Sequence, residues 1–490
     1  MKFADLDPRP AIGPLDGRYA PVVAELADYF SEPALNRARI RVEVEWLIHL
    51  LDSHALPGAP QLAAAERTYL RGIVDSFGPA QIAELGEIER QTVHDVKAVE
   101  YFLQRRLGGP ARDAIGPDTV LTERLAPVIH FACTSEDINN LAYALLIRGG
   151  IRQVWLPAAR ELHADLADLA GQHPDQPMLA RTHGQPATPT TLGKELVVFS
   201  FRLGRQLDRI EAAEYLGKIN GATGTYGAHQ VAVPGTDWIE VSRAFVEDQL
   251  KLAWNPLTTQ IESHDWQAEL YSDVARFNRI AHNLATDIWT YVSLGYFAQV
   301  RGHGTVGSST MPHKVNPIRF ENAEANLEIS SALLDTLATT LVTSRLQRDL
   351  TDSTTQRNVG VALGHSLLAI DNLRRGLAGL DPNPEPMLAD LAANPEVLAE
   401  PIQSAMRAAA VAGVPGMDNP YERLKELTRG HRVSLEEIRQ FIAGLGLPPA
   451  TTARLAELEP ATYTGLASEL VQRYFNDAVG WPEPPERSQP

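Results

Sequence analysis

Residues 261–294, IESHDWQAELYSDVARFNRIAHNLATDIWTYVSL, contain neither glycine nor proline. Their apolar side chains recur in steps of three and four, at Leu270, Val274, Phe277, Ile280, Leu284 and Ile288. This spacing predicts one apolar stripe along an α-helix. A helix of about 30 residues is about 45 Å long, which is much longer than the average helix of about 11 residues. The stretch therefore predicts a large helical bundle.

Other segments extend this pattern in both directions along the chain. Residues 318–359 also lack glycine and proline, and residues 190–216 carry a second stripe of apolar residues. A further helical segment is predicted over 136–170, after Thr134 and Ser135, with interruptions at Gly149-Gly150 and Pro157. Period-2 segments are few, and residues 230–233 are the best candidate for a strand. The predicted fold class is all-α, and helices of this length favour association of subunits through the bundle.

Two stretches rich in helix-breaking residues, the first in glycine and proline and the second in proline, predict the domain boundaries. They are Gly108–Asp118 and Asp381–Pro386, and 490 residues correspond to about three domains. We expect an N-terminal helical domain over 1–117 and a central long-helix domain over 118–380. A C-terminal helical domain with a proline-rich tail follows over 381–490.

The composition limits the possible partners and the compartment. The formal net charge is −17, which argues against nucleic-acid binding and against docking on anionic membranes. Cys133 is the single cysteine, which excludes an internal disulfide, an iron–sulfur cluster and a CxxC zinc site. No signal peptide and no apolar run long enough to cross a membrane is visible. A cytoplasmic protein is expected.

Residues 302–316, GHGTVGSSTMPHKVN, are the most unusual segment of the chain. Three glycines precede a run of hydroxyl and nitrogen donors that includes Ser308, Ser309, Lys314 and Asn316. Loops that only reverse the chain rarely need so many donors, although an ordinary solvent-exposed loop is the simplest alternative. A serine beside a cation can act as a base if its alkoxide is stabilised.

Histidines in two further segments are candidates for proton transfer. His183 lies in ARTHGQPATPTT, residues 180–191, where two prolines predict an irregular loop before a helix. His94 is followed directly by Asp95, and on a helix these neighbours point in different directions, so no relay between them is expected. Histidine is the side chain best suited to proton transfer near neutral pH, but a purely structural histidine is an alternative at both positions.

Candidate anion-binding groups occur in two places despite the acidic composition. Arg348, Ser353 and Arg357 could share a helix end and bind a phosphate or carboxylate, or they could form surface ion pairs with neighbouring aspartates. Thr134 and Ser135 could cap the helix that follows or bind an anion at its N-terminus.

The loop motif GSSTMPHKVNP resembles the signature loop of the fumarase/aspartase superfamily. The motifs TSEDINN, RTHGQPATPTT, LGKINGA, TTQIE, RDLTDSTTQR and PYERLKELTRG together resemble its adenylosuccinate lyase family. The resemblance runs from PLDGRY to about Arg432. It implies cleavage of adenylosuccinate to AMP and fumarate, and of SAICAR to AICAR and fumarate, without a metal or organic cofactor. It also implies three helical regions and a central bundle shared in a homotetramer, with each active site built from three subunits.

The resemblance assigns roles to individual residues. It implies that Ser308 is the general base and His183 the general acid, while Ser309 is a carboxylate ligand rather than the base. Lys314 and Asn316 would stabilise the alkoxide and the carbanionic intermediate. The remaining residues that it implies contact substrate are Arg18, Tyr19, His94, Asp95, Thr134, Ser135, Lys218, Asn220, Gln260, Asn322, Arg348, Ser353 and Arg357.

Two alternatives stay open. A sister lyase would act on argininosuccinate, aspartate or malate, but RDLTDSTTQR and PLDGRY favour a substrate with a nucleotide phosphate. A catalytically inactive structural homologue is the other alternative, against which the presence of both His183 and Ser308 argues. One departure from the family pattern is RGHGTV, which replaces the more usual acidic run before the signature serines.

Overall fold

The computed structural model describes residues 10–299, 315–428 and 433–476. The chain divides into two compact units, which we describe separately. Unit 1 comprises residues 1–160, 206–279 and 325–371, and unit 2 comprises residues 161–205, 280–324 and 372–490. The domain boundaries expected from the sequence remain predictions.

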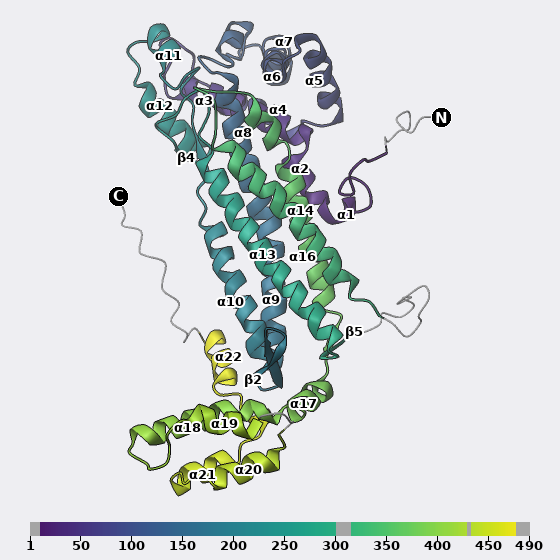
Figure 1. Ribbon diagram of the computed structural model, residues 1–490. Coiled ribbons are helices and arrows are strands. Elements are labelled where there is room, and N and C mark those ends of the chain that lie inside the picture. The colour runs from purple at the N-terminus through teal and green to yellow at the C-terminus, as the bar shows by residue number, and fades with distance from the viewer. Residues whose placement is uncertain (1–9, 300–314, 429–432, 477–490) are drawn as a thin grey trace. The chain divides into compact units, whose positions relative to one another are not determined.

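Helices make up most of the described chain, as the sequence predicts (Figure 1). Those in the first half are α1 (Ala20–Val23), α2 (Ala27–Phe30), α3 (Glu32–Asp52), α4 (Ala64–Asp75), α5 (Pro79–Thr92), α6 (Asp95–Gln104), α7 (Gly109–Ile115), α8 (Ser135–Gly149), α9 (Leu156–Gln172), α10 (Leu192–Glu211), α11 (Gly227–Ala232) and α12 (Trp238–Ala244). Those in the second half are α13 (Asp265–Ser293), α14 (Ile318–Leu341), α15 (Thr351–Gln356), α16 (Val359–Leu377), α17 (Pro384–Ala392), α18 (Ala399–Val411), α19 (Pro420–Thr428), α20 (Leu435–Ala443), α21 (Pro449–Ala456) and α22 (Ala467–Phe475). Among the described helices, none combines the length and the apolar character that a membrane span requires.

Three two-stranded sheets interrupt the helices of the described chain. They pair β1 (Pro177–Thr182) with β2 (Gln185–Thr191), β3 (Leu216–Gly217) with β4 (Ala253–Trp254), and β5 (Phe297–Gln299) with β6 (Leu380–Pro382). The strand predicted at 230–233 is wrong, because these residues belong largely to α11. The irregular loop predicted over 180–191 is also wrong, since most of it forms a β-ribbon. Its Pro186 and Pro189 are tolerated because a ribbon of two strands consists only of edges.

The apolar stripe of α13 is buried along its whole length. Leu270, Val274, Phe277, Ile280, Leu284 and Ile288 are all 7% exposed or less. The stripe of α10 is buried in the same way. Burial of these stripes supplies the main stabilisation of the long helices, because intrinsic helix propensity is a weak contribution.

Helix α8 continues through a π-helical turn, residues 150–155, into α9. The interruption predicted at Gly149-Gly150 is thus a local π turn rather than a break. A Cβ atom on Gly149 would lie 2.3 Å from the ring of Tyr29, and one on Gly150 would lie 2.4 Å from the ring of Phe30. The two glycines therefore let the segment before α3 pack directly on the backbone of this helix.

The stretch 318–359 does not form one helix, contrary to what its lack of glycine and proline suggests. Helix α14 ends at Leu341, and Leu346 adopts a left-handed conformation. Short polar side chains satisfy the backbone there: Ser344 Oγ accepts from the Asp349 amide, and Asp349 accepts from the amides of Arg345 and Thr351. Such bonds compete with helical ones, and the sequence interpretation neglected them.

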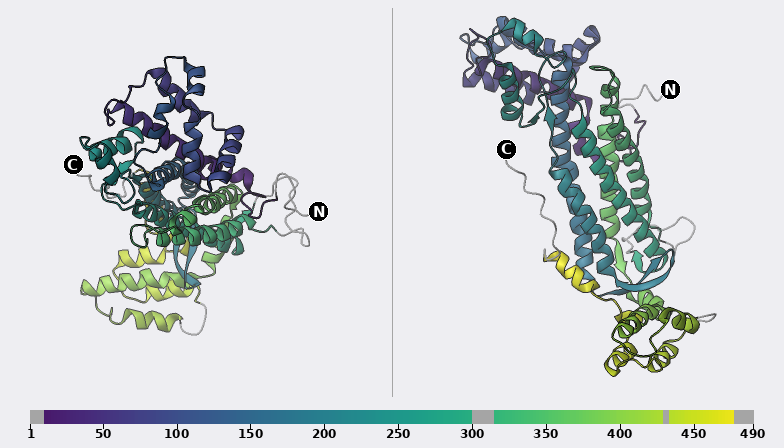
Figure 2. Two further views of the ribbon diagram at one scale, coloured as in Figure 1. Left: turned by 90° about the horizontal axis from the view of Figure 1, so that it is seen from above. Right: turned by 60° about the vertical axis from the view of Figure 1, so that its left-hand side comes forward.

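Smaller apolar cores support the regions beside the long helices. In unit 1, α3–α7 enclose a cluster that includes Leu47, Phe102 and Leu121. In unit 2, α18–α21 enclose another that includes Ile402, Met406 and Ile442. These C-terminal helices form the group of short yellow-green helices in Figure 2.

Candidate active site

The N-terminus of α8 is fixed by the buried carboxylate of Asp137. Its two oxygens accept hydrogen bonds from the backbone amides of Thr134 (2.8 Å), Asn220 (3.0 Å) and Gly221 (3.1 Å). Lys218 Nζ lies 2.8 Å from the same carboxylate, and both side chains are fully buried. One aspartate thus holds together two segments that the sequence analysis assigned to substrate binding.

Lys218 is therefore directed at Asp137 and not at solvent. Asn140 reinforces this by donating to the Lys218 carbonyl and accepting from the Lys218 amide. The side-chain nitrogen of Asn220 donates to Thr258 Oγ1 at 2.8 Å, whereas its buried oxygen has no hydrogen-bond partner among the described residues. The predicted contacts of Lys218 and Asn220 with substrate stay predictions.

Arg348 lies against the first turn of α8. Its Nη2 atom is 2.8 Å from Glu136 Oε1, and its Nη1 atom donates to Gln260 Oε1 at 3.4 Å. Gln260 in turn donates to the Ala222 carbonyl at 3.0 Å. Asp352, one of the neighbouring aspartates that could pair with these arginines, is farther from Arg348, at 4.0 Å. The structure thus brings Arg348, Gln260 and the α8 N-terminus together.

Asp95 joins two more arginines. It accepts from Arg39 Nη2 at 2.7 Å and lies 3.6 Å from Arg357 Nη2. Burial by itself would raise the pKa of Asp95, but the charge of Arg39 and hydrogen bonds from Arg39 and the Val96 amide lower it below its usual value. Arg357 also donates to Ser353 Oγ at 3.1 Å, so two predicted anion ligands are in contact.

Asn139 connects these two groups of residues. It accepts from Arg39 Nε at 2.9 Å and donates to Glu136 Oε1 at 2.8 Å. We call the resulting chain of contacts the α8 network. Its members are Arg39, Asp95, Glu136, Asn139, Gln260, Arg348 and Arg357. All of them belong to unit 1. Arg348 and Arg357, whose side chains are 19% and 42% exposed, can bind an anion such as a phosphate. Arg39 is 1% exposed and donates to Asn36, Asp95 and Asn139, so it supports the network from inside the protein.

His94 is the N-cap of α6 rather than a residue inside a helix. Its Nδ1 atom accepts from the Lys97 amide at 3.1 Å, and the side chain is 52% exposed. The same nitrogen is 3.8 Å from Asp95 Oδ1, which is too far for a hydrogen bond. The expectation that these two neighbours form no relay agrees with this distance.

His130 and Glu43 form a further polar pair beside the TSED segment. His130 Nδ1 lies 2.6 Å from Glu43 Oε1, and the His130 amide donates to the other carboxylate oxygen at 3.1 Å. Burial would lower the pKa of His130, but the hydrogen bond and charge of Glu43 outweigh it and raise that pKa. The pair holds His130 in a left-handed conformation four residues before Thr134.

In unit 2, His183 occupies the tip of the ribbon β1–β2. Thr182 pairs with Gln185, and the two residues between them, His183 and Gly184, have positive φ angles of 54° and 73°. Positive φ at both central positions is typical of a tight type I′ hairpin turn. The side chain of His183 is exposed. We refer to residues 177–191 as the His183 hairpin.

The other predicted site residues differ in how far the structure places them. Asn316 lies two residues before the start of α14, and Asn322 lies in its first turns. Ser308, Ser309 and Lys314 lie outside the described residues. Arg18 and Tyr19 follow a turn in which the amides of Gly17 and Tyr19 both donate to the Pro14 carbonyl, and the Arg18 guanidinium lies 5.9 Å from the ring centre of Tyr19.

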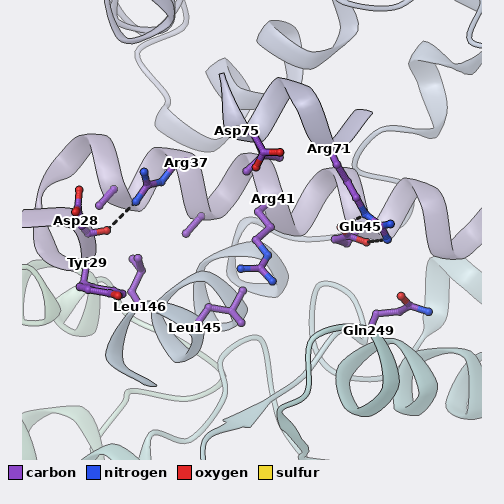
Figure 3. A pocket seen from close by; sticks show the side chains of 13 residues that line it. Asp28, Tyr29, Arg37, Arg41, Glu45, Arg71, Asp75, Leu145, Leu146 and Gln249 are labelled. Carbon is purple, nitrogen blue, oxygen red and sulfur yellow. Dashed lines mark hydrogen bonds and ion pairs between the residues drawn. The ribbon is translucent and has the colours of Figure 1, made fainter. Parts of the chain in front are cut away.

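A large hollow of unit 1 contains none of the predicted site residues (Figure 3). It has a volume of about 740 Å³ and lies between α3, α4 and the end of α8. Arg37, Arg41 and Arg71 line it, opposed by Asp28, Glu45 and Asp75. The balance of charges gives this hollow no preference for an anion, and we place the candidate site at the α8 network instead.

Sequence reasoning missed Arg39, Glu136 and Asp137. For Asp137 a signal was present, because a threonine followed three residues later by an acidic residue is a helix-capping pattern. Arg39 is 1% exposed and lies in the largely buried helix α3, where a charge needs a partner. That partner, Asp95, is 56 residues away along the chain.

Comparisons with known proteins show the family of the chain. The family model described as "Lyase" matches residues 17–328, and the model described as "Adenylosuccinate lyase C-terminal" matches residues 344–464. The chain is 48% identical over 462 residues to the adenylosuccinate lyase of Escherichia coli K12, covering 94% of this chain and 98% of that protein. It is 46% identical to the adenylosuccinate lyase of Haemophilus influenzae, with the same coverage.

A solved structure shares the fold. The fumarate lyase from Mesorhizobium sp. BNC1 superposes with a TM-score of 0.71 at 20% identity, covering 92% of this chain and 97% of that one. The family models and the named relatives show that the chain belongs to the adenylosuccinate lyase family of the fumarase/aspartase superfamily.

Proposed function

We propose that this lyase eliminates fumarate from adenylosuccinate, giving AMP, and from SAICAR, giving AICAR, in purine nucleotide biosynthesis. The observation that carries the proposal is the 48% identity to a named adenylosuccinate lyase over 94% of the chain. The arginines of the α8 network support it, because both substrates carry a phosphate and two succinyl carboxylates. A cytoplasmic homotetramer with sites shared between subunits completes the proposal.

The reaction requires two proton transfers. A base removes a proton from the carbon next to a succinyl carboxylate, and the electron pair moves into that carboxylate to form an aci-carboxylate. The pair then returns to form the fumarate double bond as the carbon–nitrogen bond breaks, and an acid protonates the departing nitrogen. In this proposal Ser308 is the base and His183 is the acid, and no cofactor takes part.

The remaining residues bind and stabilise charge. Lys314 and Asn316 offset the charge of the Ser308 alkoxide and of the aci-carboxylate, which is electrostatic stabilisation of a transition state. Thr134 and Ser135, at the N-terminus of α8, bind the succinyl portion. Arg18, Tyr19, Arg348, Ser353 and Arg357 bind on the phosphate side. His94, Asp95, Lys218, Asn220, Gln260 and Asn322 line or position the rest of the site.

The test is turnover of the purified protein, followed by the absorbance change as adenylosuccinate becomes AMP. We expect turnover of adenylosuccinate and none of argininosuccinate, and the reverse would overturn the proposal. In the same assay Ser308→Ala should lower kcat by about 10³-fold or more, a loss typical of removing a catalytic base. Ser309→Ala is the matched control and should mainly raise KM. A near-normal kcat for Ser308→Ala would exclude Ser308 as the base.

A further inference from the structure

The His183 hairpin needs support from outside the ribbon. An isolated two-stranded ribbon is only marginally stable in water, and residues 182–186, at the tip, are all exposed. A general acid must be held near its proton acceptor, and a displacement of about 1 Å can reduce a rate by about 10²-fold. The contacts at the base of the ribbon therefore determine how well His183 is placed.

One contact at the base is apolar and connects β1 with α17. Leu179, which is 1% exposed, belongs to a small buried cluster with Leu391 and Val397. This cluster fixes the inner half of β1. The pairing of β1 with β2 is irregular between Leu179 and Arg181, and a bulge of this kind redirects the side chains that follow it.

The second contact is ionic and lies two residues before His183. Arg181 Nη2 forms an ion pair with Asp390 Oδ2, on the residue next to Leu391 in α17. The hydroxyl of Tyr296 donates to the same carboxylate oxygen at 2.6 Å. Burial and then the hydrogen bond to Asp390 raise the pKa of Tyr296, so the phenol keeps its proton. Asn394 donates to the other oxygen of Asp390 at 3.2 Å.

Asp390 is itself held in a defined orientation. Tyr296 is 1% exposed, and its carbonyl accepts from the Asn383 amide at 2.8 Å, just before α17 begins. The carboxylate of Asp390 is only partly exposed and accepts from three side chains. A carboxylate with three donors and little freedom can orient the guanidinium that pairs with it.

We propose that Asp390, oriented by Tyr296, is a positioning residue that holds Arg181 and thereby aims the His183 hairpin. This inference rests on the proposed function, in which His183 is the general acid. Asp390 acts through His183 and does not itself contact the substrate. The apolar cluster keeps the ribbon attached to α17, and the ion pair sets the direction of its tip.

A double-mutant cycle on kcat for adenylosuccinate tests the proposal. In the wild-type background, Asp390→Asn should lower kcat about 10- to 100-fold with little change in KM, because the acid is misplaced while the groups that bind substrate are untouched. In a His183→Ala background the same substitution should cause no further loss, because the residue that it positions is gone. A loss that persists at full size in that background would overturn the proposal.

Two further variants complete the design. Glu385→Gln removes an exposed carboxylate from the same helix and should leave kcat unchanged. If Asp390→Asn does not fold, Tyr296→Phe replaces it in the same double-mutant cycle. We then expect a smaller loss of kcat, which disappears in the His183→Ala background. Wild-type protein without turnover of adenylosuccinate would overturn the proposed function. If the wild-type protein turns over adenylosuccinate but the kcat losses of Asp390→Asn and His183→Ala are additive, the proposed role of Asp390 is overturned and the proposed function stands.

Discussion

The α8 network and the His183 hairpin hold their polar residues in opposite ways. In the network, charges lie partly or fully buried, and each is paired with a residue from a distant segment, such as Arg39 with Asp95 or Arg348 with Glu136. In the hairpin, the histidine is exposed on a two-residue turn with positive φ angles. The network is suited to holding a charged substrate rigidly. The hairpin is suited to bringing one proton donor to a defined point.

The largest effect is expected from a change to the fully buried ion pair of Asp137 and Lys218, which lies beside the α8 network. Asp137→Asn leaves Lys218 buried without a countercharge, and we expect a loss of about 3–5 kcal/mol in the free energy of unfolding. Urea unfolding at fixed protein concentration measures it. Glu240→Gln, which breaks an exposed pair with Arg243, is the control and should have little effect. Equal stability of Asp137→Asn and wild type would show that the ion pair of Asp137 with Lys218 does not stabilise the fold.

Arg348→Ala tests whether the α8 network binds the substrate. Hydrogen bonds to charged groups contribute about 1.5–3 kcal/mol, so KM for adenylosuccinate should rise about 10- to 100-fold with a smaller change in kcat. Arg345 provides a matched control, because it is 83% exposed whereas Arg348 is 19% exposed. Steady-state kinetics of both variants decide the matter. An unchanged KM with a lower thermal stability would mean that Arg348 serves only as an ion-pair partner.

The smallest expected effect is a pH dependence of stability from His130. Its folded-state pKa is raised by Glu43, so the stabilisation is fully present below the unfolded-state pKa and is lost as the pH rises through the folded-state value. His130→Gln should therefore cost more unfolding free energy at about pH 5.5 than at about pH 8.5. The double variant with Glu43→Gln should lack this dependence. A cost that grows toward high pH would contradict the pairing.

Much of the fold follows from local sequence pattern, and the failures have a physical origin. The stripe of α13 and the cap at Thr134 could be predicted because helix periodicity and capping are local properties. The end of α14 at Leu341 was missed because side chains of Ser344 and Asp349 replace helical hydrogen bonds there.

The site was only partly predictable. Motif resemblance pointed to Arg348, Gln260 and Arg357, which the structure brings into one network. It gave no sign of Arg39, because the partner of Arg39 is 56 residues away and only folding brings the two together.

The central claim is that the network binds substrate while His183 supplies a proton. Equilibrium binding of adenylosuccinate to inactive variants tests it most directly. We expect that Kd for His183→Ala lies within about threefold of Kd for Ser308→Ala, and that adding Arg348→Ala to His183→Ala raises Kd about 10- to 100-fold. A Kd for His183→Ala at least tenfold weaker than for Ser308→Ala, with no further change on adding Arg348→Ala, would contradict it.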